Sequence, residues 1–247
     1  MIRSLMAMAL TLGMASSAFA VDKAYFEIKK VTVTDVTAQY ANQFKATTNS
    51  VNGLNQDCNT GADFVARTSS ETSVLDAANP LNVVELIVDQ IINIGKKIFN
   101  VIQAGRPVVN LKLDTANALP KGLTCWSDLA GWNMPESKVY NVVYENGFGM
   151  SVVDFSYRVT YTAGGSADGV GKYITNATFQ PANVSVAWGF AFDATAQIPS
   201  VFNTGSRKDP VAGMQMNMEW KVTSAVAHEQ STESYFVSGE NKLIQLQ

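Results

Sequence analysis

The sequence predicts a mostly β protein of the α+β class, an antiparallel β-sandwich or partly closed barrel with one long amphipathic helix packed on it. Three observations lead to this fold class. Several runs after residue 108 alternate apolar and polar side chains with a period of two, as strands do when one sheet face is buried. Turn signals such as Asn146-Gly147 separate these runs. One segment, 82–104, instead spaces its apolar residues with the period of a helix.

The first twenty residues have the three parts of a secretory signal peptide. Arg3 gives a charged start, an apolar run follows over 5–15, and small residues lead up to Ala20. This apolar run is too short to span a membrane as a helix, which needs about 20 residues. We therefore expect cleavage after Ala20, export to the periplasm or the medium, and a single β-rich domain over 21–247.

The first element expected after the signal peptide is a strand over 25–37, because β-branched residues dominate its loosely alternating pattern. From 38 to 80 the pattern disappears in a stretch rich in Asn, Thr, Ser and Ala. We interpret this stretch as loops with one short strand near 64–66. A loop region of this length in a compact domain is usually functional; the alternative is that the loop assignment is wrong.

The segment 82–104 predicts a long amphipathic helix. Its apolar residues, among them Ile91 and Ile98, fall within one half of a helical wheel, and charged or amide side chains fill most of the other half. Asn82 is suited to cap the start, and Gly105 followed by Pro107 ends the segment. We expect Ile91 and Ile98 to be buried against the sheet; a helix lying on a membrane surface is the alternative.

The remaining elements are predicted as antiparallel strands. The glycine-rich run 164–169 is expected to close one hairpin, and Pro181 is expected to mark an edge or a bulge because proline lacks a backbone N–H. Strands are expected near 109–114, 138–145, 153–161, 173–179, 184–193, 214–223 and 233–238.

The chain has two cysteines, Cys58 and Cys125. An even number of cysteines in an exported protein predicts a disulfide, because extracytoplasmic compartments oxidise paired thiols. We therefore expect Cys58 and Cys125 to be bonded to each other. The same oxidation disfavours the alternative, a catalytic thiol at Cys125 acting with His228.

The net charge of −3 argues against nucleic-acid binding, because no cluster of lysine and arginine is present to contact phosphates. His228 is the only histidine, which excludes a multi-histidine metal site. A hydrolase triad would have to use this one histidine, and no Gly-x-Ser-x-Gly motif supports it. We expect no cofactor, with calcium as the one possibility to consider.

That possibility comes from Asp57, Asn59 and Asp63, which alternate in a polar loop. Oxygen ligands with this spacing suit Ca²⁺, but the bidentate glutamate of an EF-hand is missing at the expected distance. These residues are the calcium candidate, and an ordinary Asx-rich turn is the alternative.

The connection expected over 198–210 is the candidate contact loop. It places Val201 and Phe202 beside Arg207 and Lys208. Apolar residues next to basic ones suit a membrane surface or an acidic ligand. The alternative is that Phe202 folds back onto the sheet, as aromatic residues in loops often do.

Together these features predict an exported, non-enzymatic binding or structural protein. Its partner would be an apolar ligand, a membrane surface or another exported protein, because one sheet face and one helix face are rich in large apolar residues. The first alternative is a membrane-acting β-protein, either a secreted pore former or a small outer-membrane barrel, which the long alternating strands support. The second alternative is a hydrolase of unknown class.

Overall fold

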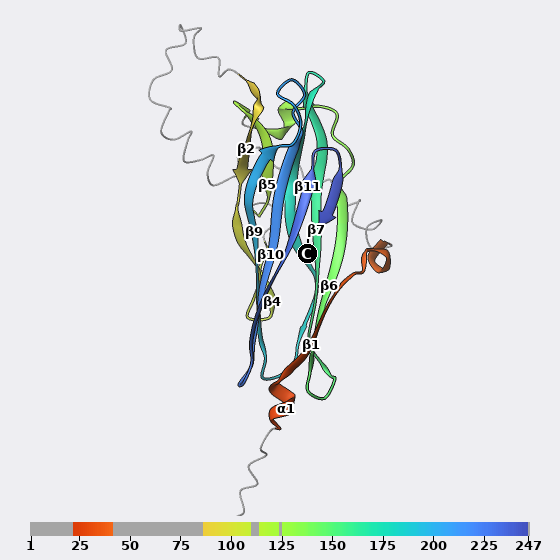
Figure 1. The fold of residues 1–247 in the computed structure, drawn as a ribbon, viewed down its shortest axis with the longest axis vertical. Helices are drawn as coiled ribbons and strands as arrows, with labels where there is room; N and C mark the ends of the chain where they lie inside the picture. Colours follow the sequence, from red (N-terminus) through yellow and green to blue (C-terminus); the bar gives the residue numbers. More distant parts are fainter. Residues whose placement is uncertain (1–21, 42–85, 110–113, 124, 247) are drawn as a thin grey trace, which may run out of the picture.

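Two antiparallel β-sheets pack face to face in the computed structural model, which describes residues 22–41, 86–109, 114–123 and 125–246. Figure 1 shows an elongated sandwich whose strands run roughly along its long axis. Each sheet has six strands within the described residues. The prediction of a mostly β, antiparallel sandwich is therefore confirmed.

The first sheet has the strand order β1-β6-β7-β8-β5-β2, and the second has the order β12-β11-β10-β9-β3-β4. A short helix, α1 (Lys23–Phe26), precedes the first strand, and a 3-10 helix, η2 (Trp126–Asp128), lies between β5 and β6. The strands of the first sheet are β1 (Ile28–Asp35), β2 (Ile87–Gly95), β5 (Ala116–Lys121), β6 (Glu136–Asn146), β7 (Ser151–Ala167) and β8 (Val170–Val186). Those of the second are β3 (Ile98–Gln103), β4 (Arg106–Pro107), β9 (Ala191–Asn203), β10 (Ala212–Thr223), β11 (His228–Ser238) and β12 (Lys242–Gln245).

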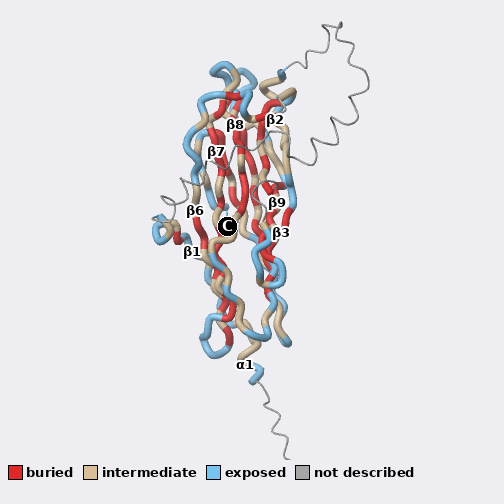
Figure 2. Tube along the Cα trace, turned by 180° about the vertical axis from the view of Figure 1, so that it is seen from behind, coloured by how far each residue is buried: buried red, intermediate tan, exposed pale blue. Residues whose placement is uncertain are grey.

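Large side chains from the two inner sheet faces fill the core, and Figure 2 shows that exposed residues gather at the turns. The alternation predicted for β10 is confirmed, because its apolar face is buried from Met214 to Val222. Two polar contacts also join the sheets. The hydroxyl oxygens of Tyr157 and Tyr235 lie 2.6 Å apart, and Trp220 Nε1 donates a hydrogen bond of 2.8 Å to the Tyr144 hydroxyl.

The predicted helix over 82–104 is wrong, because its described part forms strands β2 and β3, and no long helix occurs among the described residues. Gly95 ends β2 with a φ of 112°, where a Cβ would collide with the Thr115 carbonyl oxygen, so the chain needs glycine at this corner. The chain then crosses from the first sheet to the second. Ile91 packs partly buried against the core as expected, whereas Ile98 is 63% exposed.

Two predicted strand boundaries are also corrected. The run 184–193 is the end of β8 and the start of β9, joined by a tight turn at Trp188 and Gly189. The glycine-rich run 164–169 turns only at Asp168 and Gly169, because β7 continues to Ala167. At Trp188 the alternation continues through the end of a strand and hides where the chain reverses, whereas in 164–169 the glycines suggest a longer turn than the one that forms.

Other strand predictions are confirmed. The strand expected over 25–37 is β1 in its central part, although 23–26 form α1. The bulge expected at Pro181 is present, since the register between β7 and β8 shifts where Tyr157 pairs with Pro181. β6, β10 and β11 contain the strands expected near 138–145, 214–223 and 233–238.

Some predicted features lie outside the described residues. They are the signal peptide, the short strand near 64–66, the calcium candidates Asp57, Asn59 and Asp63, and most of the strand expected over 109–114. Within the part of the chain that the structure describes, no helix has the length and apolar character needed to cross a bilayer.

Candidate functional site

Three turns and the N-terminal helix meet at one end of the sandwich, the end where α1 lies in Figure 1. The turns join β6 to β7, β8 to β9 and β10 to β11. Backbone groups of α1 bond to the first turn, since Gly147 N–H donates to the Ala24 carbonyl oxygen over 2.9 Å. The Ser224 hydroxyl, from the third turn, donates to the Phe26 carbonyl oxygen over 2.8 Å. The N-terminal segment therefore ties the three turns together.

Aromatic rings reinforce this arrangement at the second turn. The Tyr25 hydroxyl donates to the Trp188 carbonyl oxygen over 3.1 Å, and its ring lies 5.9 Å from that of Phe190. The Phe26 ring lies 6.2 Å from that of Trp188. Gly189, at φ 81°, permits this contact, because a Cβ there would lie 2.6 Å from the Phe26 ring. Ring pairs at such separations add about 0.5–1.5 kcal/mol each beyond their buried area.

The side chains at this end leave much apolar surface in contact with solvent. Trp188 is 74% exposed, Phe148 55%, Met150 53% and Val226 47%. We call these four residues, together with Phe26 and Phe190, the apolar tip. Sequence reasoning misses it because the alternation over 184–193 predicts one continuous strand through Trp188. The Trp-Gly pair within an alternating run was the signal that could have revealed a turn.

The predicted contact loop lies at the other end of the sandwich, where β9 passes into β10, and its boundaries need correction. Residues 198–203 belong to β9, so Val201 and Phe202 are strand residues, and only 204–211 form the connection. Val201 packs against the core, whereas the Phe202 ring stacks 5.8 Å from that of Phe236 and stays partly exposed. Arg207 and Lys208 are exposed in the connection. Whether these four residues contact a partner stays a prediction.

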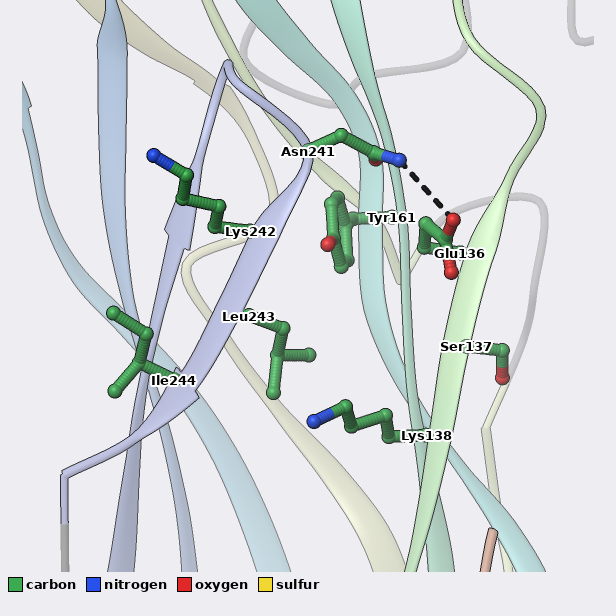
Figure 3. Close-up of a pocket in the computed structure, with 8 residues that line it drawn as sticks. All are labelled: Glu136, Ser137, Lys138, Tyr161, Asn241, Lys242, Leu243 and Ile244. Atoms are coloured by element: carbon green, nitrogen blue, oxygen red, sulfur yellow. Dashed lines mark hydrogen bonds between the residues drawn. The ribbon is translucent and has the colours of Figure 1, made fainter. Parts of the chain in front are cut away.

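A pocket of about 390 Å³ lies at the lateral seam between the two sheets (Figure 3). We call it the seam pocket. It is lined by residues 136–138 of β6, Tyr161 of β7, and residues 241–244 at the start of β12. Burial, assisted by the negative charge of Glu136, raises the pKa of Tyr161 to about 12, so its hydroxyl stays protonated at neutral pH. The pocket could not be inferred from the sequence, because its walls come from opposite sheets.

The remaining candidate residues give no catalytic or metal arrangement within the described ranges. Cys125 is not a free cysteine, and its expected partner Cys58 lies outside the described residues, so their pairing stays a prediction. His228 is exposed at the start of β11. Among described residues no group of three His, Cys, Asp or Glu side chains is placed to hold a metal ion.

Comparisons with protein-family models, curated protein sequences and solved structures gave no match. The functional argument therefore depends on the surfaces described above.

Proposed function

We propose that the protein is an exported, non-enzymatic binding protein that docks on a lipid membrane surface through the apolar tip. The observation that supports this proposal is that Trp188, on the turn between β8 and β9, and Phe148 and Met150, on the turn between β6 and β7, gather at one end of the sandwich, each more than half exposed. Exposed apolar groups gathered at one place mark an interaction surface in soluble proteins. Tryptophan in particular favours the boundary between headgroups and acyl chains.

The shape of the tip favours lipid over a protein partner. Its apolar side chains are carried on tight turns that project from the end of the sandwich, and a bilayer can accept such projections without a matching groove. By contrast, the interior between the sheets is filled by side chains such as Trp220, Tyr144 and Phe155. This filling disfavours the alternative of an apolar ligand held between the sheets.

The lysines near the tip contact carboxylates, so attraction to anionic lipid should contribute little. Lys23 and Lys29 both contact Glu27, at 3.5 and 3.2 Å, and Lys30 contacts Glu145 at 3.4 Å. Full burial of one large apolar side chain contributes about 1.5–3 kcal/mol, and association costs several kcal/mol. We therefore expect weak, reversible binding that depends on apolar contact.

Vesicle flotation tests this proposal. The wild-type protein should float with phosphatidylcholine vesicles, and raising the salt concentration should change the bound fraction little. Phe148→Ser/Trp188→Ser should abolish flotation, because it removes the two most exposed rings of the tip. The thermal unfolding midpoint should stay near that of wild type, since both side chains are mostly in water.

Phe202→Ser is the matched control, because it also removes a partly exposed ring but at the opposite end. Its flotation should equal that of wild type. If Phe202→Ser or Arg207→Gln/Lys208→Gln abolished binding while the tip variant retained it, the predicted contact loop would replace the tip. Absence of flotation by wild type under all conditions would refute membrane docking.

A further inference from the structure

We propose that the seam pocket binds an extended peptide with an acidic side chain, and that this peptide adds as a further strand to the free edge of β12. This inference concerns the side of the sandwich and does not depend on the apolar tip. Strand addition gives affinity through backbone hydrogen bonds, and neighbouring pockets give specificity.

The free edge follows from the pairing of β12. Among the described strands it pairs with β11 alone, and it ends the strand order of its sheet. Leu246 N–H donates to the Ser234 carbonyl oxygen over 2.8 Å, which shows that the even-numbered residues direct their backbone groups toward β11. The N–H and C=O groups of Leu243 and Gln245 therefore point away from β11, toward the seam.

β1 leaves the opposite wall of the seam uncovered. β1 pairs with β6 from Tyr140 to Asn146. Just before this paired part, the Val139 N–H donates a hydrogen bond to the Thr37 hydroxyl. Residues 136–138 of β6 are therefore not paired with β1, and they lie opposite β12 across the pocket in Figure 3. β12 spans roughly 14 Å at about 3.4 Å per residue, which suits a peptide of about four or five residues.

One buried polar atom in the pocket lacks a hydrogen-bond partner. Asn241 Nδ2 donates to Glu136 Oε1 over 3.1 Å, but Asn241 Oδ1 is buried and receives no hydrogen bond in the structure. An acceptor left in this state costs about 1–3 kcal/mol. A peptide N–H entering the pocket would supply the missing donor, so the pocket is suited to a ligand with backbone amides.

One lysine of the pocket, Lys138, favours an acidic side chain on the peptide. Lys242 Nζ lies 2.8 Å from Glu240, so this second lysine already has a carboxylate partner, and Asn241 donates a hydrogen bond to Glu136. Lys138 extends from β6 toward Leu243 in Figure 3, and it makes no ion pair with any described residue. An acidic side chain on the added strand would pair with Lys138 while its neighbours contact Leu243 and Tyr161.

Two other edge strands, β1 and β4, fit less well. β1 carries Lys29 and Lys30 beside a register shift, a combination that opposes strand addition. β4 has only two residues, Arg106 and Pro107, and proline cannot donate to a new ladder. Among these edges, β12 alone combines outward backbone groups with a pocket.

The test uses two blocked peptides, acetyl-Thr-Val-Glu-Val-Thr-amide and the same peptide with lysine in place of glutamate. Backbone amide chemical shifts of the full protein should move at 136–138 and 241–245 on addition of the first peptide. The glutamate peptide should bind at least about tenfold more tightly than the lysine peptide, as expected for one partly buried ion pair.

Gln245→Pro removes one outward N–H but leaves the bonds between β12 and β11, and it should weaken binding at least tenfold. Gln245→Ala is its matched control, because it removes the same side chain and keeps the N–H, and it should bind like wild type. Lys138→Glu should reverse the preference between the peptides, whereas Lys221→Glu, an equal charge change on β10, should not.

Three results would overturn the proposal. The first is that neither peptide binds at millimolar concentration. The second is that binding occurs but the two Gln245 variants behave alike. The third is that the protein dimerises with concentration and shifts the same amides without peptide, which would assign the β12 edge to a second copy of the chain.

Discussion

Tyrosine hydroxyls buried between the sheets show how single residues set the conditions under which this fold is stable. Burial raises the pKa of Tyr140 and Tyr173, as well as that of Tyr161, to about 12. It raises the pKa of Tyr157 and Tyr235 as well, and these two hydroxyls meet in the core. All five hydroxyls are therefore neutral in the folded protein, and ionising one would place a charge in a region of low dielectric.

This burial predicts unfolding at alkaline pH. Below about pH 10 both the folded and the unfolded states keep the tyrosine protons, so the free energy of unfolding does not change. Between about pH 10 and 12 only the unfolded state loses them, and stability should fall by about 1.4 kcal/mol per pH unit for each such tyrosine.

Circular dichroism and tyrosinate absorbance, recorded together across this range, measure the effect. Ionisation of these five tyrosines and loss of the circular dichroism signal should coincide in one cooperative step above pH 10. Tyrosinate formation by more than three of the eight tyrosines with unchanged circular dichroism would show that the buried hydroxyls are accessible in the folded state.

At the scale of elements, the sequence predicted the strands better than the chain reversals between them. β6, β7, β10 and β11 were predictable because one face of each is buried and the other is polar over many residues. A helix was wrongly predicted for 82–104 because the isoleucines and valines of this segment fit half of a helical wheel. Their β-branched side chains and Gly95 favour strands, and here this preference outweighs the helical spacing.

A bulge explains part of that error. The register between β3 and β9 shifts between Asn100 and Ile102, so Val101 and Ile102 are both buried although they are adjacent in sequence. Adjacent buried residues break the period of two and resemble the spacing of a helix. The apolar tip and the seam pocket were also beyond prediction, because they depend on which turns and edges the folded sheets bring together.

Ile98 and Ile102 provide a direct test of strand against helix. A helix would place these residues on one face, four positions apart, and both alanine variants would then be destabilised. In the strand Ile98 is 63% exposed and Ile102 is 1% exposed. Ile102→Ala should therefore lower the free energy of unfolding by about 2–5 kcal/mol, and Ile98→Ala by about 0.5 kcal/mol or less.

Urea denaturation of the two variants measures both losses in the free energy of unfolding, and the substitution, isoleucine to alanine, is the same in each. Equal losses of more than 2 kcal/mol would contradict the strand assignment of β3.

For the molecule as a whole, the two proposed surfaces do not overlap. The apolar tip lies at one end of the sandwich, and the seam pocket lies on its side, between β6 and β12. A protein docked on a bilayer through the tip would keep the seam pocket in solution. The proposals therefore describe a protein that could hold a peptide near a membrane, and each can fail without affecting the other.

The predicted pairing of Cys58 with Cys125 also acts on the whole molecule, because it would close a long loop of chain. Denatured, unreduced protein should show no free sulfhydryl in a thiol titration, since the compartments to which the predicted signal peptide would direct the chain oxidise paired thiols. Reduction should lower the free energy of unfolding by about 2–4 kcal/mol. Two free thiols per chain in the unreduced sample would disprove the bridge.

The pairing of β1 with β6 has a consequence for the timing of folding. β1 is the first strand of the described chain, and its partner β6 follows about a hundred residues later. At one end of this pairing Ile28 lies opposite Asn146. During synthesis the N-terminal region cannot complete its sheet until most of the chain has emerged, and such distant pairings form slowly. An export apparatus that accepts unfolded chains would thus meet an N-terminus that is still unpaired. The same strand order that closes the finished sandwich would keep the newly made chain fit for transport.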